Sequence, residues 1–150
     1  MIELQAYVRE DSPSEIVDWR SLSETDLLYY YFVGDIYLKV EGADLSAPWG
    51  WVPVIDFALN LQYAMKVLRQ GSSAELKFTE SEHVIRFRRS AGLLEVSATY
   101  TSATASTSFR EFDQYVANFV PQVRTMIVER APEMEHNIAF LRLFFERAGE

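Results

Sequence analysis

Residues 53–71, PVIDFALNLQYAMKVLRQG, are the stretch that decides the fold of this chain. Pro53 suits the first turn of a helix, where its missing N–H costs nothing, and Asp56 complements the positive end of the helix dipole. Gly71 is a typical C-terminal signal, so we predict a helix from 53 to about 69. Apolar side chains lie almost all round this helix, which indicates a central position with packing on more than one side.

Strands are predicted after this helix. Apolar and polar side chains alternate over 75–79, 85–88 and 94–100, the pattern of half-buried strands. The turn at 90–92, Ser-Ala-Gly, joins the last two strands as a hairpin. Residues 103–107 are compatible with one further short strand.

Strands are also predicted before the helix. Residues 2–9 alternate in the same way, and residues 27–33, LLYYYFV, have the aromatic and β-branched composition of a strand. Gly34 and Asp35 are expected to form a turn into a second hairpin arm over 36–41. The segments 10–25 and 42–53 are predicted loops, the first with a short helix around 16–19.

Two helices are predicted to close the chain. Ser108 and Glu111 form a capping box, so a helix begins there and runs to Ala131, with an expected kink at Pro121. A last helix is predicted over about 135–147. Because the strands come in consecutive runs, the expected fold class is α+β: a mainly antiparallel sheet of five to six strands with about three helices packed on one face, in one domain over 1–150. The open face would carry the polar side chains Tyr37, Lys39, Glu41, Lys77, Arg86, Arg88, Glu95 and Thr99.

Composition narrows the classes of function. The chain has 150 residues, 49% of them hydrophobic, which is enough for a substantial core. It has no cysteine, which excludes disulfides, thiolate metal sites and cysteine nucleophiles. The first residues do not resemble a signal peptide, and no apolar run is long enough to span a bilayer. We therefore expect a cytoplasmic protein without membrane contact.

Negative charge is concentrated in the first part of the chain. The formal net charge is -8, which argues against nucleic-acid binding. Residues 1–60 hold 11 acidic and 3 basic side chains, whereas residues 61–150 hold 11 of each, so the whole excess lies before residue 61. This charge either serves solubility or forms an acidic surface that attracts a basic partner. On the second interpretation, Asp35 and Asp44 are candidate binding residues.

Recognisable catalytic machinery is missing from the sequence. It contains no nucleophile elbow, phosphate-binding loop, dinucleotide fingerprint, zinc-protease motif or calcium loop. We expect no catalytic residue and no cofactor, and interpret the chain as a binding protein rather than an enzyme.

Two small polar groups still deserve a chemical interpretation. Glu80, Glu82 and His83 combine oxygen and nitrogen ligands that a metal ion accepts, or else form a solvated turn. Asp56 and Asn60 lie four residues apart on the apolar helix. They either line a pocket, with Asp56 as a general base, or serve the helix start and a nearby loop.

Arginine and tryptophan supply the remaining candidate binding residues. Arg86 and Arg88 share one side of a predicted strand, where they either grip a carboxylate or phosphate or pair with acids such as Glu95. Trp49 and Trp51 flank a glycine in a predicted loop. They are either interface anchors or a lid over the core.

A resemblance extends over about residues 34–145. The stretches GDIYLKVEGADLSAPWGWVPVIDFALNL (34–61) and FTESEHVIRFRRSAGLLEVSATY (78–100), followed by two helices, resemble a bacterial domain family of unknown function found in actinomycetes. The resemblance rests on ordinary residues and not on a chemical motif. It implies a small bacterial protein and no particular activity.

Two functions remain open at this point. The first is a non-catalytic protein-binding domain, of immunity or regulatory type, that neutralises a basic partner protein. The second is a small-molecule-binding protein or small enzyme with a pocket between the 53–70 helix and the sheet. Either could act as a monomer or a homodimer.

Overall fold

Two antiparallel four-stranded sheets form one side of the protein in the computed structural model, which describes residues 1–12 and 18–147. Sheet A contains β1 (Ile2–Val8), β2 (Val33–Val40), β3 (Ala43–Asp44) and β4 (Ala47–Pro53), with β2 paired to the other three. Sheet B is the meander of β5 (Ser73–Lys77), β6 (Val84–Ser90), β7 (Leu93–Ala98) and β8 (Thr104–Ser108). The predicted α+β class is confirmed, but the single sheet of five to six strands with about three helices is wrong, since the described residues form two four-stranded sheets and four α-helices.

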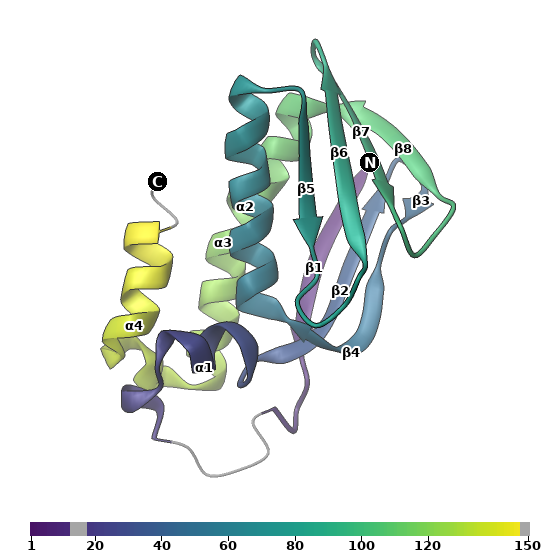
Figure 1. Cartoon of the computed structure of the whole chain (residues 1–150). Coiled ribbons are helices and arrows are strands. Elements are labelled where there is room, and N and C mark those ends of the chain that lie inside the picture. Colours follow the sequence, from purple (N-terminus) through teal and green to yellow (C-terminus); the bar gives the residue numbers. More distant parts are fainter. Residues whose placement is uncertain (13–17, 148–150) are drawn as a thin grey trace.

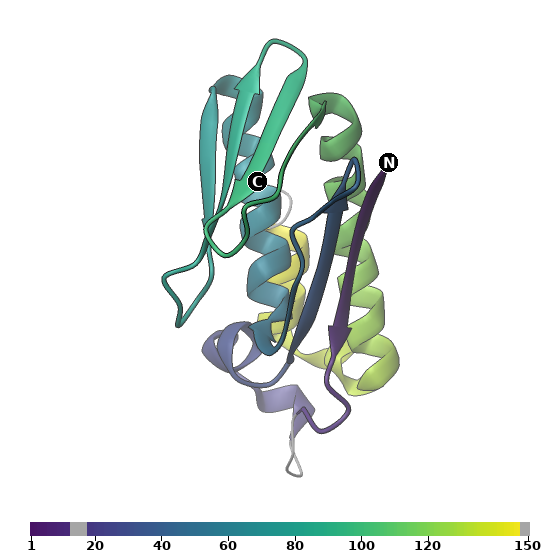
Figure 2. The same ribbon diagram turned by 90° about the vertical axis from the view of Figure 1, so that its right-hand side faces the viewer.

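Helices cover one face of both sheets. The long helices α2 (Val54–Gln70) and α3 (Phe109–Arg130) pack against each other and against the strands, as Figure 1 shows. Turned by 90°, the strands lie in front and the two helices behind them (Figure 2). The opposite face of each sheet is therefore free of helices. All eight polar side chains predicted for the open face are exposed, although they are divided between two sheets.

The central position of α2 is confirmed. Ten of its seventeen residues are buried, from Val54 near the start to Leu68 near the end. Phe57 stacks on Phe78 after β5 and meets Phe119 of α3 edge-on, at ring-centroid distances of 5.7 and 6.3 Å. Because α2 contacts the sheets on one side and α3 on the other, both faces of this helix need apolar residues.

The segment 27–33 is helical over its first half, and its prediction as a strand is wrong. Helix α1 (Glu24–Tyr29) begins at a capping box, in which the Ser23 hydroxyl accepts from the Asp26 amide at 3.1 Å and the Asp26 carboxylate accepts from the Ser23 amide at 3.1 Å. Leu27 and Leu28 of this helix are buried. The cap outweighed the aromatic composition, because strand propensity is a weak local preference.

The predicted turn at Gly34 and Asp35 is also wrong, since both residues lie inside β2. The partner of β2 is β1, with Gly34 opposite Val8 and Asp35 opposite Tyr7. The predicted loop over 42–53 instead contains β3 and β4, which also pair with β2. The pairing with β4 is irregular between Gly34 and Ile36, and Gly50 adopts φ 80°, a conformation that favours glycine.

Two side-chain hydrogen bonds connect the sheets where β8 passes beside β2. The Thr107 hydroxyl donates to the Glu41 carboxylate at 3.1 Å, and the Tyr100 hydroxyl donates to the Leu45 carbonyl at 2.6 Å. Thr107 is buried and Tyr100 is partly buried. The sheets are thus neighbours held by side chains rather than by a shared strand ladder.

The C-terminal helices differ from their prediction in two respects. Helix α3 starts at Ser108, whose hydroxyl accepts from the Glu111 amide at 3.2 Å, and it continues through Pro121. Only this half of the predicted capping box is present in the described structure. The predicted helix over 135–147 is divided into a 3₁₀ turn (Pro132–His136), α4 (Ile138–Leu141) and a π-helical turn (Arg142–Arg147). The division falls at Asn137, whose side chain caps α4 by accepting from the Phe140 amide.

The segment between β1 and α1 contains a 3₁₀ turn at Trp19–Ser21. The short helix predicted around 16–19 lies mostly outside the described residues. Among the described helices, none has both the length and the apolar composition that a membrane crossing requires.

Candidate binding surface

The outer face of sheet A gathers acidic and aromatic side chains. Residues 34, 36, 38 and 40 of β2 are buried, so the odd-numbered residues point away from the helices, together with their partners on β1 and β3. Trp51 shares this side, because its neighbour Val52 is buried opposite Gly34. We call this surface the sheet A face; it consists of Glu3, Gln5, Tyr7, Asp35, Tyr37, Lys39, Glu41, Asp44 and Trp51.

Two exposed tyrosines occupy the middle of the sheet A face. Tyr7 is 52% exposed and Tyr37 is 36% exposed, and their rings meet edge-on at a centroid distance of 5.5 Å. The Tyr7 hydroxyl donates to the Gln5 side chain at 2.7 Å. The two rings are therefore held in position by each other and by Gln5, which lowers the entropy that a contact with a partner would cost.

Trp49 and Trp51 differ in their surroundings, and each matches a different one of the two predicted roles, a lid over the core or an interface anchor. Trp49 is half-buried and packs against Phe78 and Tyr100, at centroid distances of 5.0 and 4.9 Å. Trp51 stacks on the outside of Trp49 at 5.1 Å and remains 39% exposed. Trp49 is thus a lid on the core, while Trp51 presents an indole to the solvent.

Asp35 fixes the tryptophan segment to β2. Its carboxylate accepts a hydrogen bond from the Gly50 amide at 2.8 Å, between the two tryptophans. Any side chain at Gly50 would also strain the local backbone, because φ there is 80°. Asp35 is therefore both a negative charge beside Trp51 and the anchor that positions it.

Hydrogen bonds lower the pKa of two carboxylates of the sheet A face, Asp44 and Glu41. Hydrogen bonds from the Ser46 hydroxyl and amide lower the pKa of Asp44, with a further contribution from Lys39. Hydrogen bonds from the Met1 amino group and Thr107 lower the pKa of Glu41. With Glu3 and Asp35, the face holds four carboxylates against two cations, the Lys39 ammonium and the Met1 amino group that pairs with Glu41, so acid predominates.

Tyr100, behind the two tryptophans, is expected to make the stability of the fold depend on pH in the alkaline range. Burial raises the pKa of its phenol, and the charge of Asp44 adds to the effect. Tyr100→Phe is expected to lower the free energy of unfolding by about 1 kcal/mol, because the buried Leu45 carbonyl loses its donor. The protonated phenol stabilises the fold fully below the unfolded pKa of about 10, and this stabilisation is lost as pH rises through the folded pKa.

Urea unfolding at about pH 8 and about pH 11 measures both effects. The original chain should lose more stability between these pH values than the Tyr100→Phe variant does. Tyr63→Phe is the matched control, because Tyr63 is 65% exposed. An identical pH response of the original chain and the Tyr100 variant contradicts the prediction.

Asp56 and Asn60 have a structural explanation. Asp56 is buried in the first turn of α2 and accepts a hydrogen bond from the Thr79 hydroxyl at 2.7 Å. Asn60, one turn later, is half-buried. Neither residue lines the hollows described below, and the role of Asp56 as a general base stays a prediction.

The proposed metal ligands are not gathered in the structure. Within the described residues, no three His, Cys, Asp or Glu side chains lie close enough to hold a metal ion together. Glu80 and Glu82 are exposed in the turn between β5 and β6, whereas the His83 ring packs against Trp49 at 5.3 Å. The turn is thus a solvated connection with its histidine turned towards the aromatic cluster.

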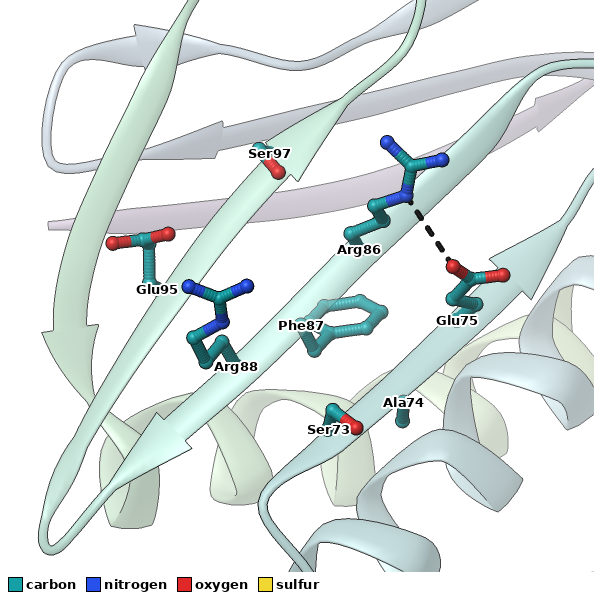
Figure 3. A pocket seen from close by; sticks show the side chains of 8 residues that line it. All are labelled: Ser73, Ala74, Glu75, Arg86, Phe87, Arg88, Glu95 and Ser97. Carbon is teal, nitrogen blue, oxygen red and sulfur yellow. Dashed lines mark hydrogen bonds and ion pairs between the residues drawn. The ribbon is translucent and has the colours of Figure 1, made fainter.

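Arg86 and Arg88 lie on the open face of sheet B, at a shallow hollow of about 530 Å³ (Figure 3). Arg86 donates to the Glu75 carboxylate on β5 at 3.3 Å, and Arg88 stands opposite Glu95 on β7. Arg86 therefore forms a cross-strand pair with an acidic residue, and the strand register places Arg88 directly opposite another. Because the hollow carries two guanidinium groups and two carboxylates, its charges largely balance, which disfavours a strong anion site.

Comparison with known proteins identifies no relative: no protein-family model, no curated protein and no solved structure matches this chain. The resemblance to a bacterial domain family consequently stays a prediction.

Sequence reasoning did not select Glu3, Tyr7 and Tyr37 as site residues. The alternation in residues 2–9 already placed Glu3 and Tyr7 on the polar side of a strand. What it could not reveal is that β1 pairs with β2, which brings Tyr7 next to Tyr37. The alternation within each strand was visible in the sequence, but the proximity of Tyr7 and Tyr37 depends on the pairing of two segments about thirty residues apart.

Proposed function

We propose that this chain is a non-catalytic protein-binding domain, and that its sheet A face receives a basic surface of the partner protein. The observation that carries the proposal is the presence of exposed Tyr7, Tyr37 and Trp51 among four carboxylates on a sheet face that no helix covers. Such a protein would act by occupying its partner, as immunity-type and regulatory proteins do. A cytoplasmic bacterial setting belongs to the same proposal.

The aromatic residues suit the centre of an interface. Tyrosine and tryptophan are enriched among residues that dominate binding energy, because they bury a large area at a low cost in side-chain entropy. Here the Tyr7 and Tyr37 rings brace each other, and Trp51 rests on Trp49. These side chains are therefore already ordered before a partner arrives.

The carboxylates suit the recognition of a basic partner. Glu3, Asp35 and Asp44 surround the aromatic residues and attract positive charge over roughly 8–10 Å at physiological salt. Electrostatic attraction of this kind mainly raises the association rate. We expect association to slow strongly with added salt, while dissociation changes little.

A double substitution tests the proposal. Tyr7→Ser with Tyr37→Ser removes both rings, and we expect the affinity for the native partner to fall at least about tenfold. The partner is first captured from the host with the original chain and then purified, and its affinity is measured by calorimetry at low and high salt.

The matched control is Tyr63→Ser with Tyr115→Ser. These tyrosines are 65% and 39% exposed and lie on α2 and α3, on the other side of the molecule. The control should bind the same partner with unchanged affinity. Equal binding by both double variants, or a partner whose association does not depend on salt, would contradict the proposed function.

A further inference from the structure

The outer edge of β1 leaves its backbone groups without a strand partner. At the two ends of the β1–β2 ladder, the Glu41 amide donates to the Met1 carbonyl at 2.8 Å and the Arg9 amide donates to the Val33 carbonyl at 2.9 Å. Odd-numbered residues of β1 therefore bond to β2, and Leu4, Ala6 and Val8 direct their N–H and C=O groups to the opposite edge. Within the described residues, no strand pairs with that edge.

A hollow of about 260 Å³ lies directly beside this edge, between β1 and α3. We call it the edge groove. Its floor is made by Phe119 and Val123, which are buried, and by Met126, which is partly buried. The side chains of Gln5 and Gln122 stand at its rim, and Ala6 forms part of its wall. The groove thus combines an apolar floor with a row of free backbone groups.

We propose that the edge groove receives one extended segment of the partner, which adds to β1 as a further strand of sheet A. This inference rests on the proposed function for the existence of a protein partner. Main-chain hydrogen bonds would form with Leu4, Ala6 and Val8, and every second side chain of the segment would enter the groove. Because Tyr7 borders the groove and also belongs to the sheet A face, both contacts form one continuous interface.

The charges around the groove indicate a basic segment. Glu3 on β1 and Glu129 on α3 are exposed and form no ion pair with the described residues. Among the nearby cations, Arg9 is paired with the Asp11 carboxylate, whereas Lys39 stands opposite Glu3 and Arg130 donates to the Glu10 carbonyl. We expect lysine or arginine at the solvent-facing positions of the segment and apolar side chains at the positions that enter the groove.

A second copy of this chain fits the same edge less well. Helix α3 reaches beyond β1 at the outer edge of the sheet, as Figure 2 shows, and its residues form the groove floor. Symmetric pairing of two β1 strands would place them about 4.8 Å apart, whereas packed helices need about 8–10 Å between their axes. Two copies of α3 would therefore compete for the same space, while a single extended segment leaves α3 in place.

The test uses a short synthetic peptide in which lysine and valine alternate, followed by NMR on the full chain. When it pairs antiparallel to β1 with its valines in the groove, the peptide directs the valine amides towards β1 and the lysine amides away from it. We expect shifts and slowed hydrogen exchange at the amides of Leu4, Ala6 and Val8. The same peptide with N-methylated valines should not bind, whereas N-methylation of its lysines should preserve binding.

Two substitutions at Ala6 remove different parts of the site. Ala6→Pro deletes one outward N–H and leaves the ladder to β2 intact, which edge strands tolerate. Ala6→Leu keeps the amide and fills the groove. Each should weaken the peptide at least about tenfold, whereas Ala117→Leu on the exposed side of α3 should change nothing. Should Ala6→Pro fail to fold, the Ala6→Leu variant and the methylated peptides decide whether a segment pairs with the edge of β1.

The outcomes separate this inference from the proposed function. Peptide binding elsewhere, equal binding of both methylated peptides, or a concentration-dependent dimer that protects the β1 amides without peptide overturns the edge inference. Partner binding that depends on Tyr7 and Tyr37 but not on Ala6 overturns the edge inference and leaves the proposed function standing. If the peptide binds at β1 but capture of the partner does not depend on Tyr7 and Tyr37, the proposed function alone is overturned.

Discussion

Replacement of Gly34 by alanine is expected to destabilise the protein by about 3 kcal/mol or more, the range of severe overpacking in a buried site. Gly34 is buried in β2 opposite Val8. A Cβ atom there would overlap the Tyr7 carbonyl oxygen and lie 2.8 Å from the Tyr7 carbonyl carbon and 3.0 Å from the Val8 Cα. All three are backbone atoms, so the end of β1 must move away from β2 to make room.

The matched control for this substitution is Gly92→Ala. No atom lies within 4 Å of a Cβ built at Gly92, and its φ is outside the left-handed region. Alanine there should leave the free energy of unfolding unchanged or raise it by a few tenths of a kcal/mol, up to about 1 kcal/mol. Urea unfolding of the two variants measures the difference, and equal midpoints would show that β1 adjusts without cost.

Gly34 also shows where sequence reasoning failed in sheet A. A glycine followed by aspartate is a common turn signal, so the segment was predicted to reverse direction. In the structure, the position needs the absence of a Cβ because another strand approaches closely, and its φ is not positive. The two reasons for a glycine look the same in a sequence when the partner strand is unknown.

The parts predicted correctly are those that depend on local patterns. The alternation in 85–88 and 94–100 predicted that Ile85, Phe87, Leu94, Val96, Ala98 and Tyr100 face the core; the first four are buried and the last two are partly buried. The apolar helix after Pro53 and the cap at Ser108 were also confirmed. Each of these signals acts within a few residues, so tertiary packing reinforced it instead of reversing it.

The division into two sheets could not be predicted, because it depends on long-range pairing. Nothing in residues 2–9 indicates that β2 rather than the 27–33 segment would be their neighbour. The candidate site was limited in the same way: Trp51, Asp35 and Asp44 were selected individually, while the contact between Tyr7 and Tyr37 requires the register of two strands. The edge groove needs, in addition, the position of α3 beside β1.

Asn137 is expected to be the most sensitive polar residue of the helical end of the molecule. It is 1% exposed, and its amide group donates to the carbonyl oxygens of Trp19 at 2.7 Å and Leu22 at 3.0 Å. Its side-chain oxygen accepts from the Phe140 amide at 3.0 Å. One side chain thus caps α4 and fastens it to the segment before α1, more than a hundred residues away in the chain.

Asn137→Ala is expected to lower the free energy of unfolding by about 3 kcal/mol, because three backbone groups, two of them buried and one partly buried, lose their partners at about 1 kcal/mol or more each. The measurement is urea unfolding, with the Trp19 and Phe140 regions followed by NMR. We expect the contact between α4 and the Trp19–Ser21 turn to loosen first, while the ladders of sheet B remain protected from hydrogen exchange.

Asn137→Asp tests which of these bonds carries the stability. The variant keeps the shape and the oxygen that caps α4, but it replaces the NH₂ donor with an oxygen facing two carbonyl oxygens. Because a buried carboxylate oxygen that has no donor and faces two carbonyl oxygens is costly, the loss should equal or exceed that of Asn137→Ala. Asn118→Asp is the control, since Asn118 is exposed on α3 and should tolerate the same change. A near-native Asn137→Asp variant would mean that the cap alone holds α4, and that the bonds to Trp19 and Leu22 contribute little.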